Sequence, residues 1–339
     1  MKKNNQTLSS RAYSQLVMVG MLWGTTAFFY KSILAVVSVS VFLSLRFLFG
    51  AIFIYVTGRK RFVSLSTKII ILIIGFTLLD TVVYNTLYSI GIQRTTVLHA
   101  AVIHLTVPFF VYFFAAVLIS EKPHKKVIFG SIIAFLGMVT IIFSASVSAT
   151  AKGAFIGDGI LLIEAIVGAL VIVWGRKIFT KHKKINGEQM SFIEFTVAIV
   201  PFAVVMLLSG DYIEIVNIQL TTWLMIVGAS ILCGALPLVL YYRVVRRLPA
   251  ERLADTNFIS PLTAAIIAVT LLGEQLTFMF VIGAVCVVTG LLISHNKLHP
   301  VLAAHRVGVS LTAIEKSFRY PRRAYEYIYA EAKSFTQFR

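Results

Sequence analysis

The feature that most constrains this chain is a series of ten apolar stretches that together occupy most of its length. A helix of about 20 residues can cross the hydrocarbon core of a membrane, which is about 30 Å thick. Of the 339 residues, 58% are hydrophobic and 13% are charged, whereas soluble domains carry about 25% charged residues. The stretches are 14–35, 39–57, 69–91, 95–119, 127–147, 157–178, 190–208, 220–242, 253–272 and 276–294. They predict a membrane protein with ten crossings.

Helices rather than strands are expected in these stretches. Strands of a membrane barrel are about 10 residues long and alternate in polarity, but these stretches are continuously apolar, as at 69–74. Cys233 and Cys286 fall within apolar stretches, so no disulfide framework is expected. Basic residues precede the first stretch as in a cleaved signal peptide, but its apolar run is long and lacks a clean cleavage site, which favours a retained span. The predicted fold class is an all-α polytopic membrane protein with ten transmembrane helices.

The basic residues are distributed very unevenly over the connecting segments. If the N-terminus is cytoplasmic, the inner segments hold 27 of the 31 Lys and Arg residues, and the outer loops hold 2, Arg94 and Lys152. The remaining 2, Lys31 and Arg46, lie within apolar stretches. Short loops rich in Lys and Arg remain in the cytoplasm, so we predict a multi-pass protein of the cytoplasmic membrane with both termini inside. The net charge of +17 is dispersed over these loops, which argues against nucleic-acid binding.

The second half of the chain repeats part of the first half. A shift of 153 residues aligns Pro108 with Pro261 and Glu121 with Glu274, and no gap is needed across two spans. The same shift also aligns Tyr88 with Tyr241, Gly130 with Gly283 and Gly137 with Gly290. Each half then has five spans, which is an odd number. The sequence therefore predicts two five-helix repeats that are inverted relative to each other in the membrane.

This repeat sets the expected domain boundaries. We expect a cytoplasmic N-terminus at 1–13, repeats at 14–147 and 157–294, and a basic tail at 295–339. Two similar halves of opposite orientation can exchange conformations and open a central site to each side in turn, which is alternating access. The alternative is a duplication that only enlarged a membrane scaffold.

Three motifs carry a resemblance to a known family: MLWGTTAFFYKSI in the first span, SLRFLFGA in the second, and the doubled block in which a glutamate follows a proline by thirteen residues. Over about residues 14 to 294, the chain resembles the drug/metabolite transporter superfamily, in particular its EamA-type branch. The resemblance implies a five-plus-five transporter whose central cavity is lined mainly by spans 1, 3, 4, 6, 8 and 9. Relatives move amino acids, other small metabolites or nucleotide-like solutes. The chain departs from the family in its long basic tail and in Gly168, where an aromatic residue is common.

The third span carries the sharpest candidate site. Asp80, Tyr84 and Tyr88 follow one another at intervals of four residues and so share one helical face, and Asn85 adjoins that face. An ionisable group at this depth is expensive, which makes it a functional candidate. Asp80 could take up a coupling proton or meet an amine on the substrate. The alternative is a buried aspartate that a neighbouring helix satisfies.

Other charged residues within the spans have two interpretations each. Glu164 and Lys31 could pair near the outer surface, either as an extracellular gate or as a static salt bridge. Arg46 and Glu194 occupy similar places in the two halves, at a shift of 148. For these two residues we expect snorkelling to the headgroups, without a role in transport.

Further cavity candidates lie on the remaining central spans. His104 and its repeat counterpart Asn257 precede the doubled prolines by four residues, and they are either substrate contacts or packing residues. His99 and His104 are five residues apart, which argues against a metal site, and none is predicted. The resemblance raises Trp23 and the tyrosines of the third span above other aromatic residues. Further aromatic wall candidates are Tyr112 and Tyr241.

Prolines and glycines suggest mechanical roles. Pro108 and Pro261 can kink their helices at symmetric places and are predicted hinges. The glycines that the repeat aligns fall seven residues apart in the fifth and tenth spans, a spacing that lets helices approach closely. These spans therefore form a packing surface or the interface of a homodimer.

The tail at 295–339 carries 8 Lys and Arg residues against 3 Glu, and its apolar residues recur at helical spacing. Basic amphipathic helices beside a membrane usually lie on its anionic leaflet, so membrane lipids are the expected partner. Docking to a cytoplasmic protein is the alternative.

No enzyme signature was found, neither a nucleophile elbow nor a P-loop nor a metalloprotease motif, and no cofactor is expected. The sequence therefore predicts a secondary transporter of a small organic metabolite, such as an amino acid, that works by alternating access and is driven by exchange or by protons. The alternative is a lipid-handling protein or a membrane-embedded enzyme or scaffold, for which Asp80 with His104 is the only candidate catalytic pair.

Overall fold

The computed structural model describes residues 2–119, 125–145, 151–182, 185–245 and 256–294, and every regular element in these ranges is a helix. The first half contains α1 (Lys2–Gly24), α2 (Thr26–Ile33), α3 (Val39–Gly58), η1 (Arg59–Arg61), α4 (Thr67–Thr77), η2 (Leu78–Val83), α5 (Tyr84–Arg94), α6 (Val97–His104), α7 (Val107–Ile119) and α8 (Lys125–Ala145). The second half contains α9 (Ala151–Lys181), α10 (Gly187–Ser209), η3 (Asp211–Ile213), α11 (Glu214–Asn217), α12 (Leu220–Gly228), η4 (Ala229–Ala235), α13 (Leu236–Val245), α15 (Thr256–Leu271) and α16 (Phe278–Ser294). The predicted tail at 295–339 lies outside the described residues.

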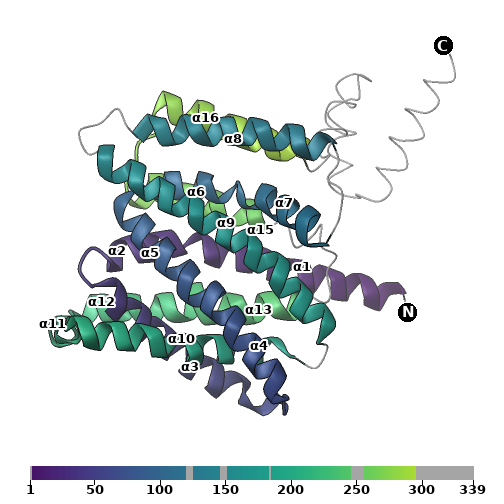
Figure 1. Cartoon of the computed structure of the whole chain (residues 1–339), viewed down its shortest axis with the longest axis vertical. Coiled ribbons are helices and arrows are strands. Elements are labelled where there is room, and N and C mark those ends of the chain that lie inside the picture. The colour runs from purple at the N-terminus through teal and green to yellow at the C-terminus, as the bar shows by residue number, and fades with distance from the viewer. Residues whose placement is uncertain (1, 120–124, 146–150, 183–184, 246–255, 295–339) are drawn as a thin grey trace.

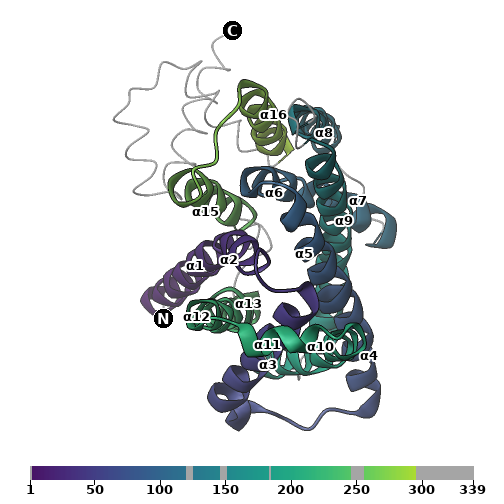
Figure 2. The same ribbon diagram turned by 90° about the vertical axis from the view of Figure 1, so that its left-hand side faces the viewer.

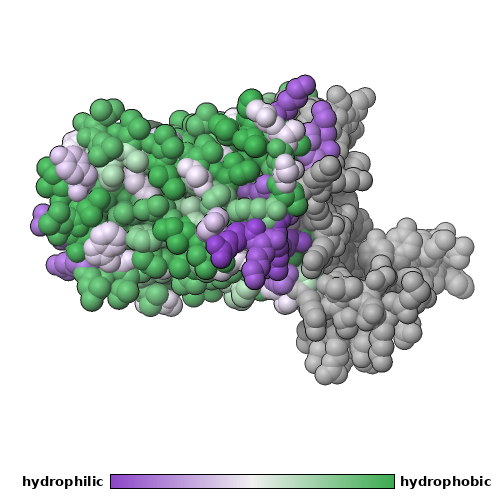
Figure 3. Space-filling view, turned by 90° about the horizontal axis from the view of Figure 1, so that it is seen from below, coloured by the Kyte–Doolittle hydropathy of each residue, from purple (hydrophilic) through white to green (hydrophobic). Residues whose placement is uncertain are grey.

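The predicted all-helical membrane fold is confirmed. Among the described residues, six helices or runs of helices are long and apolar enough to cross a membrane, and four shorter apolar helices accompany them. The shorter ones are Val97–Val111, Ile132–Ile141, Ile259–Leu271 and Phe278–Gly290. Many large apolar side chains are exposed, including Phe113, Phe129 and Leu208. Figure 3 shows one face of the molecule, which is mostly hydrophobic and has its hydrophilic side chains gathered towards the ends. Such a surface suits contact with lipid rather than with water.

The helices run back and forth between two ends of the bundle (Figure 1). At one end lie η1 and the C-terminal ends of α9 and α13, together with the exposed basic residues Arg61, Lys68 and Lys181. We call this the basic end. At the opposite end, the far end, the α2–α3 connection lies beside α11, and the backbone N–H of Ser38 donates to Glu214 at 2.8 Å. The two ends therefore differ in charge as the sequence predicts.

Spans 3 and 8 each contain a π-helical turn at a matching position. In span 3 the turn is η2, between α4 and α5, and in span 8 it is η4, between α12 and α13. The repeat shift of 153 places Asp80, which lies in η2, at the position of Cys233, which lies in η4. Short π-helical insertions within α-helices occur frequently at functional sites. These two turns therefore mark the depth at which a site is expected.

The two repeated prolines have different effects on their helices. The helix of span 4 is interrupted at Leu105 and Thr106, and Pro108 lies in the first turn of the following helix, α7. Proline is tolerated there because the first turn lacks partners for its N–H groups. Pro261, by contrast, lies inside α15, which continues through it. Only the helix of span 4 is therefore interrupted near its proline, and the hinge role of the two prolines stays a prediction.

The helices α8 and α16, which the sequence predicts as the fifth and tenth spans, lie side by side in both views (Figures 1 and 2). A Cβ atom added to Gly137 would lie 2.5 Å from the carbonyl oxygen of Gly283, and one added to Gly290 would collide with the carbonyl of Gly130. The glycines allow the two backbones to touch. The packing interpretation is thus the one that the structure supports, and this glycine face is occupied within a single chain.

Candidate functional site

A buried acid and a histidine form the centre of the candidate site. Glu164 of α9 is fully buried, and its Oε2 lies 2.9 Å from Nε2 of His104 at the end of α6. Its second oxygen, Oε1, is buried without a hydrogen-bond partner among the described residues. The ring of Tyr88 lies 5.5 Å from that of His104, and Tyr84 interacts electrostatically with Glu164. We call these four residues the His104 cluster.

A buried arginine lies beside a third tyrosine, Tyr30, and beside Asn85. The side chain of Arg46 donates from Nη1 to Oδ1 of Asn85 at 3.2 Å, and the hydroxyl of Tyr30 donates to the same oxygen at 2.9 Å. The guanidinium stands 5.4 Å from the centre of the Tyr30 ring. Its Nε is buried and has no hydrogen-bond partner in the described part of the chain. We call Arg46, Asn85 and Tyr30 the Arg46 cluster.

The two clusters meet at a pair of aromatic rings. Tyr30 and Tyr88 contact each other edge to face, with their ring centres 5.0 Å apart. Both tyrosines interact electrostatically with Arg46 and with Glu164. A cation and a carboxylate, each with one unpaired polar atom, therefore flank one aromatic pair within the bundle. An unpaired buried polar atom costs free energy, and such atoms in native proteins call for an explanation such as a ligand.

A second acidic group lies nearer the basic end. Glu194 of α10 is fully buried, and its Oε1 accepts a hydrogen bond of 2.8 Å from the hydroxyl of Tyr242. Asp80, which is half-buried in η2, interacts electrostatically with both residues. Tyr84 also interacts with Asp80, so this tyrosine lies between the second acidic group and the His104 cluster.

Gly168 makes room for Tyr84. A Cβ atom at this position of α9 would lie 2.8 Å from Cε2 of Tyr84, closer than real Cβ contacts allow. The glycine that departs from the pattern of the resembling family therefore lets the Tyr84 ring rest directly on α9. This packing holds the ring of a tyrosine that interacts with the side chains of both Glu164 and Asp80.

The far end is closed by contacts different from those that the sequence predicted. Lys31 donates from Nζ to the carbonyl oxygens of Ile92, at 3.3 Å, and of Thr95. The expected pair of Lys31 with Glu164 is not formed, because Glu164 is engaged by His104 deeper in the bundle. Equal depth in two spans does not make two side chains neighbours.

The repeated glutamate of the second half caps a helix. The two carboxylate oxygens of Glu274 accept hydrogen bonds from the backbone N–H groups of Val97 and Leu98, at 2.8 Å each. These are the first residues of α6, whose N–H groups have no partner within the helix. The negative charge also complements the helix dipole. Glu274 therefore links the segment between α15 and α16 to the start of α6. Its counterpart Glu121 lies outside the described residues.

His99 has a different acidic partner from His104. Its Nδ1 lies 2.8 Å from Oδ2 of Asp158, and Thr95 also donates to that carboxylate. Asp158 and Glu164 both belong to α9, so each histidine of α6 meets its own carboxylate. Within the described residues no group of three or more potential metal ligands is present.

The basic end is held by an ion-pair network. Glu188, at the start of α10, accepts hydrogen bonds from Arg61 and from Arg243 at 3.0 Å. The network joins η1, α10 and α13, and therefore links the two halves of the chain. The side-chain oxygen of Gln189 accepts a hydrogen bond of 3.1 Å from the backbone N–H of Val63, and its side-chain nitrogen donates one of 2.7 Å to the carbonyl oxygen of Val63.

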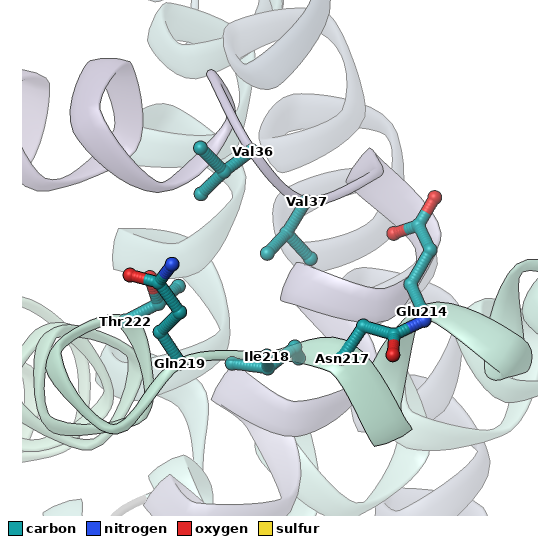
Figure 4. Close-up of a pocket in the computed structure, with 7 residues that line it drawn as sticks. All are labelled: Val36, Val37, Glu214, Asn217, Ile218, Gln219 and Thr222. Carbon is teal, nitrogen blue, oxygen red and sulfur yellow. The ribbon is translucent and has the colours of Figure 1, made fainter.

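A pocket of about 270 Å³ opens at the far end and contains none of the predicted site residues (Figure 4). It is lined by Val36, Val37, Glu214, Asn217, Ile218, Gln219 and Thr222. Close by, Ser40 donates a hydrogen bond to Asp211. Hydrogen bonds from Ser40 and then from Ser209 hold the pKa of the Asp211 carboxyl below its ordinary value.

The structure brings together most, but not all, of the predicted site residues. Asp80, Tyr84, Asn85, Tyr88, His104 and Glu164 lie in one connected group. Trp23 and Tyr241 contact each other, with ring centres 5.2 Å apart, and Tyr241 contacts Tyr242 in turn. The side chains of Tyr112 and Asn257 lie outside those that the structure describes.

Two important residues were misinterpreted from the sequence. Arg46 is only 6% exposed and Glu194 is fully buried, so the predicted snorkelling of both residues is wrong. Their depth in the sequence is compatible with reaching a membrane surface, but the face of the helix on which they lie points into the bundle. The presence of a charge within an apolar stretch was the one available signal. Tyr30 and Tyr242 carried no comparable signal.

A sequence model of the EamA-like transporter family matches residues 10–143 and 155–295. "Uncharacterized transporter YetK" of Bacillus subtilis (strain 168) is 24% identical over 270 residues, which cover 77% of this chain and 80% of that protein. "Uncharacterized transporter YyaM" of the same organism is 27% identical over 238 residues, which cover 69% and 73%. A protein of known crystal structure shares the fold with a TM-score of 0.58 at 15% identity, over 84% of this chain and 96% of that one.

Proposed function

Because this chain belongs to the EamA-like transporter family, we propose that it is a secondary transporter that moves a small organic metabolite by alternating access. Membership of this family and the apolar helices make it a multi-pass membrane protein. The proposed membrane is the cytoplasmic one. The excess of Lys and Arg at the basic end supports an orientation in which this end faces the cytoplasm.

One observation carries the proposal for the solute. Arg46 and Glu164 are buried, opposite in charge, and flank the Tyr30–Tyr88 pair, and each has one polar atom without a partner in the described structure. An arginine is well suited to a carboxylate, and a buried carboxylate is well suited to an ammonium group. A solute that carries both groups would satisfy both atoms. We therefore favour an amino acid or a related zwitterion.

The contacts at the two ends support a cycle in which each end opens in turn. At the far end, Lys31 binds the C-terminal carbonyls of α5, and Glu274 binds the N-terminus of α6. At the basic end, Glu188 holds two arginines from different elements. Both sets consist of polar contacts between different elements, so a movement of these elements would break one set while the other is kept. Lys31 is thus proposed as part of the gate at the far end, with backbone carbonyls instead of Glu164 as its partners.

The competing enzyme interpretation loses its candidate pair. Asp80 with His104 was the only pair that could serve as a catalytic couple, but His104 is bonded to Glu164 on another helix. Asp80 instead interacts with Glu194 and Tyr242. The arrangement therefore favours binding and release of a solute over catalysis.

Solute binding by the purified protein tests this proposal. A panel of amino acids, amines and carboxylates would be titrated into wild type, Arg46→Gln and Glu164→Gln, with the exposed Arg59→Gln as the matched control. Loss of one partner of a buried charge pair costs about 2–5 kcal/mol, so we expect affinity for the zwitterion to fall roughly 30-fold or more in both site variants. Binding that is unaffected by both site substitutions would contradict the assigned site.

A further inference from the structure

We propose that Asp80 and Glu194 form one proton-binding site, which is separate from the solute site at Arg46 and Glu164. The inference rests on the proposed function, because a coupling proton has meaning only if a solute is transported. It goes beyond that function by naming the coupling ion and the two residues that hold it. Neither the depth of Glu194 in the sequence nor the family assignment points to this residue.

The environment of Glu194 is the first observation. The residue belongs to α10, is fully buried, and has two oxygens in different situations. Its Oε1 accepts a hydrogen bond of 2.8 Å from Tyr242, whereas its Oε2 is buried without a partner among the described residues. The η2 turn, which carries Asp80, packs against α10. A buried acceptor without a partner among the described residues, on a helix that packs against the turn with a second carboxyl, is a candidate site for a bound proton.

The charged neighbours of this pair are all engaged elsewhere. From α3, Arg46 contacts Tyr30 and Asn85. From α13 and η1, Arg243 and Arg61 bind Glu188. On other neighbouring elements, Glu164 and Asp158 bind His104 and His99, and Asp211 lies at the far end. The exposed basic residues on these elements are Arg59, Lys60, Lys68, Arg94 and Lys181, and the side chains of Arg176 and Lys177 lie outside those that the structure describes. Within the described chain, no Lys, Arg or His forms an ion pair with Asp80 or Glu194.

Two carboxylates that share an apolar site without a cation cannot both be ionised at low cost. The usual outcome is that the pair retains one proton between its two groups, and the titration then belongs to the pair rather than to either residue. A metal ion is disfavoured, because the site supplies two carboxylates and a phenol, and no larger group of metal ligands is present in the described residues. A proton is therefore the ion that fits this site.

The internal repeat relates the proposed proton site to the proposed solute site. The shift that aligns the third and eighth spans places Asp80 at the position of Cys233, and the shift of 148 places Arg46 at the position of Glu194. Cys233 and Arg46 also interact electrostatically. The carboxyl pair on one side of the molecule thus corresponds to the arginine and the thiol on the other. In the first half of the chain, Arg46 binds the carboxylate of the solute. In the second half, the corresponding Glu194 binds a proton.

Tyr84 links the two sites. It interacts electrostatically with both Asp80 and Glu164, and it is held on α9 by the space that Gly168 leaves. Asp80 belongs to the first half of the chain and Glu194 to the second, so a movement of the halves changes their separation. Separation of the two carboxyls removes their mutual repulsion, which releases the shared proton. This release couples proton movement to the change of access.

The experiment uses the full-length protein in sealed liposomes and measures two activities at the same internal pH. The first is exchange of labelled solute for unlabelled solute without a pH gradient, and the second is accumulation driven by a pH gradient. Wild type would be compared with Asp80→Asn, Glu194→Gln and Tyr242→Phe. The half-buried Glu214→Gln at the far end is the matched control, since it removes a carboxylate outside both sites that, among the described residues, accepts a hydrogen bond only from the backbone N–H of Ser38.

We expect Asp80→Asn and Glu194→Gln to retain exchange but to lose accumulation driven by the pH gradient, whereas Glu214→Gln keeps both. Accumulation of wild-type extent in both variants would overturn the proton site, as would accumulation in wild type that needs a sodium gradient instead. Absence of exchange in wild type would sink the proposed function itself, and this inference with it.

A second measurement does not depend on transport by the variants. Infrared difference spectra of the purified protein between two pH values report the C=O stretch of a protonated carboxylic acid. We expect a band in wild type that is lost in both Asp80→Asn and Glu194→Gln and is unchanged in Glu214→Gln. A band that survives both substitutions would overturn the assignment.

Discussion

At the scale of single residues, the polar groups of the bundle interior form connected clusters. The Arg46 and His104 clusters meet at Tyr30 and Tyr88, and Tyr84 connects them to Asp80. The sequence predicts that Asp80, Tyr84 and Tyr88 share a helical face, because they recur at intervals of four residues. It could not identify the partners, which belong to other helices.

Gly168 provides a test of this connection. We predict that Gly168→Ala lowers the free energy of unfolding by about 1–3 kcal/mol, because the added methyl group collides with the Tyr84 ring. It should also weaken solute binding, since Tyr84 must move. Thermal unfolding and the binding titration measure the two effects. Gly159→Ala is the matched control on the same helix, where an added Cβ meets nothing within 4 Å; an equal effect of both substitutions would contradict this account.

Asp211 at the far end predicts a dependence on pH. Its pKa in the folded protein lies below its ordinary value because Ser40 and Ser209 donate hydrogen bonds to the carboxylate. The ordinary value is about 3.9. A depressed pKa contributes stability that is fully present above the ordinary value and is lost as the pH falls through the folded value. We therefore expect Ser40→Ala to raise the pKa of Asp211, which can be followed by NMR of the labelled carboxyl carbon. An unchanged pKa would show that the hydrogen bond from Ser40 is unimportant.

At the scale of helices, the repeated sequence features serve different purposes in the two halves. The two prolines that the sequence predicts as hinges differ in their surroundings, because the helix of span 4 is interrupted before Pro108 and α15 continues through Pro261. Sequence periodicity could not separate these outcomes, since both prolines follow similar apolar residues. The π-helical turns η2 and η4 were also unpredictable, because one extra residue in a continuously apolar stretch leaves no signature in polarity.

The cap that Glu274 places on α6 has a measurable consequence. We predict that Glu274→Ala lowers the free energy of unfolding by about 1 kcal/mol, because two N–H groups at the helix start lose their acceptors. Hydrogen exchange at Val97 and Leu98 should become faster. Gln275→Ala, at the exposed neighbouring position, should change neither quantity. Unchanged exchange in Glu274→Ala would show that the cap is dispensable.

The contact between α8 and α16 distinguishes packing from dimer formation. We expect Gly137→Val to lower the free energy of unfolding by about 1–3 kcal/mol without a change in oligomeric state, because its side chain would meet the backbone of Gly283. Gly75→Val is the control, since a Cβ there meets nothing within 4 Å. Light scattering of the purified protein reports the oligomer. Dissociation of a dimer by Gly137→Val would support the interface interpretation instead.

At the scale of the whole molecule, the sequence was informative about class and less so about mechanism. Apolar stretches predicted the helical membrane fold because a bilayer demands long helices whose backbone groups are satisfied internally. Lys31, Arg46 and Glu194 were assigned wrongly or incompletely, because a one-dimensional sequence gives the depth of a residue but not the direction in which it faces. Burial and partners required the structure.

Orientation in the membrane is a prediction at this scale. We expect a cysteine at position 60, introduced as Lys60→Cys, to react with an impermeant reagent only after the cells are opened. A cysteine introduced as Arg94→Cys should react in intact cells. Both native residues are exposed, and the native Cys233 and Cys286 would be replaced first. The reverse pattern would mean that the basic end faces outwards.

The most direct test of the central claim is exchange transport by the wild-type protein in sealed liposomes. Liposomes loaded with a pool of unlabelled amino acids would be diluted into each labelled amino acid in turn, beside liposomes that contain Arg46→Gln. The account predicts saturable uptake of at least one labelled amino acid that depends on the internal pool and is lost in Arg46→Gln. Folded wild-type protein that exchanges no member of the pool, or exchange that survives the loss of Arg46, would contradict it.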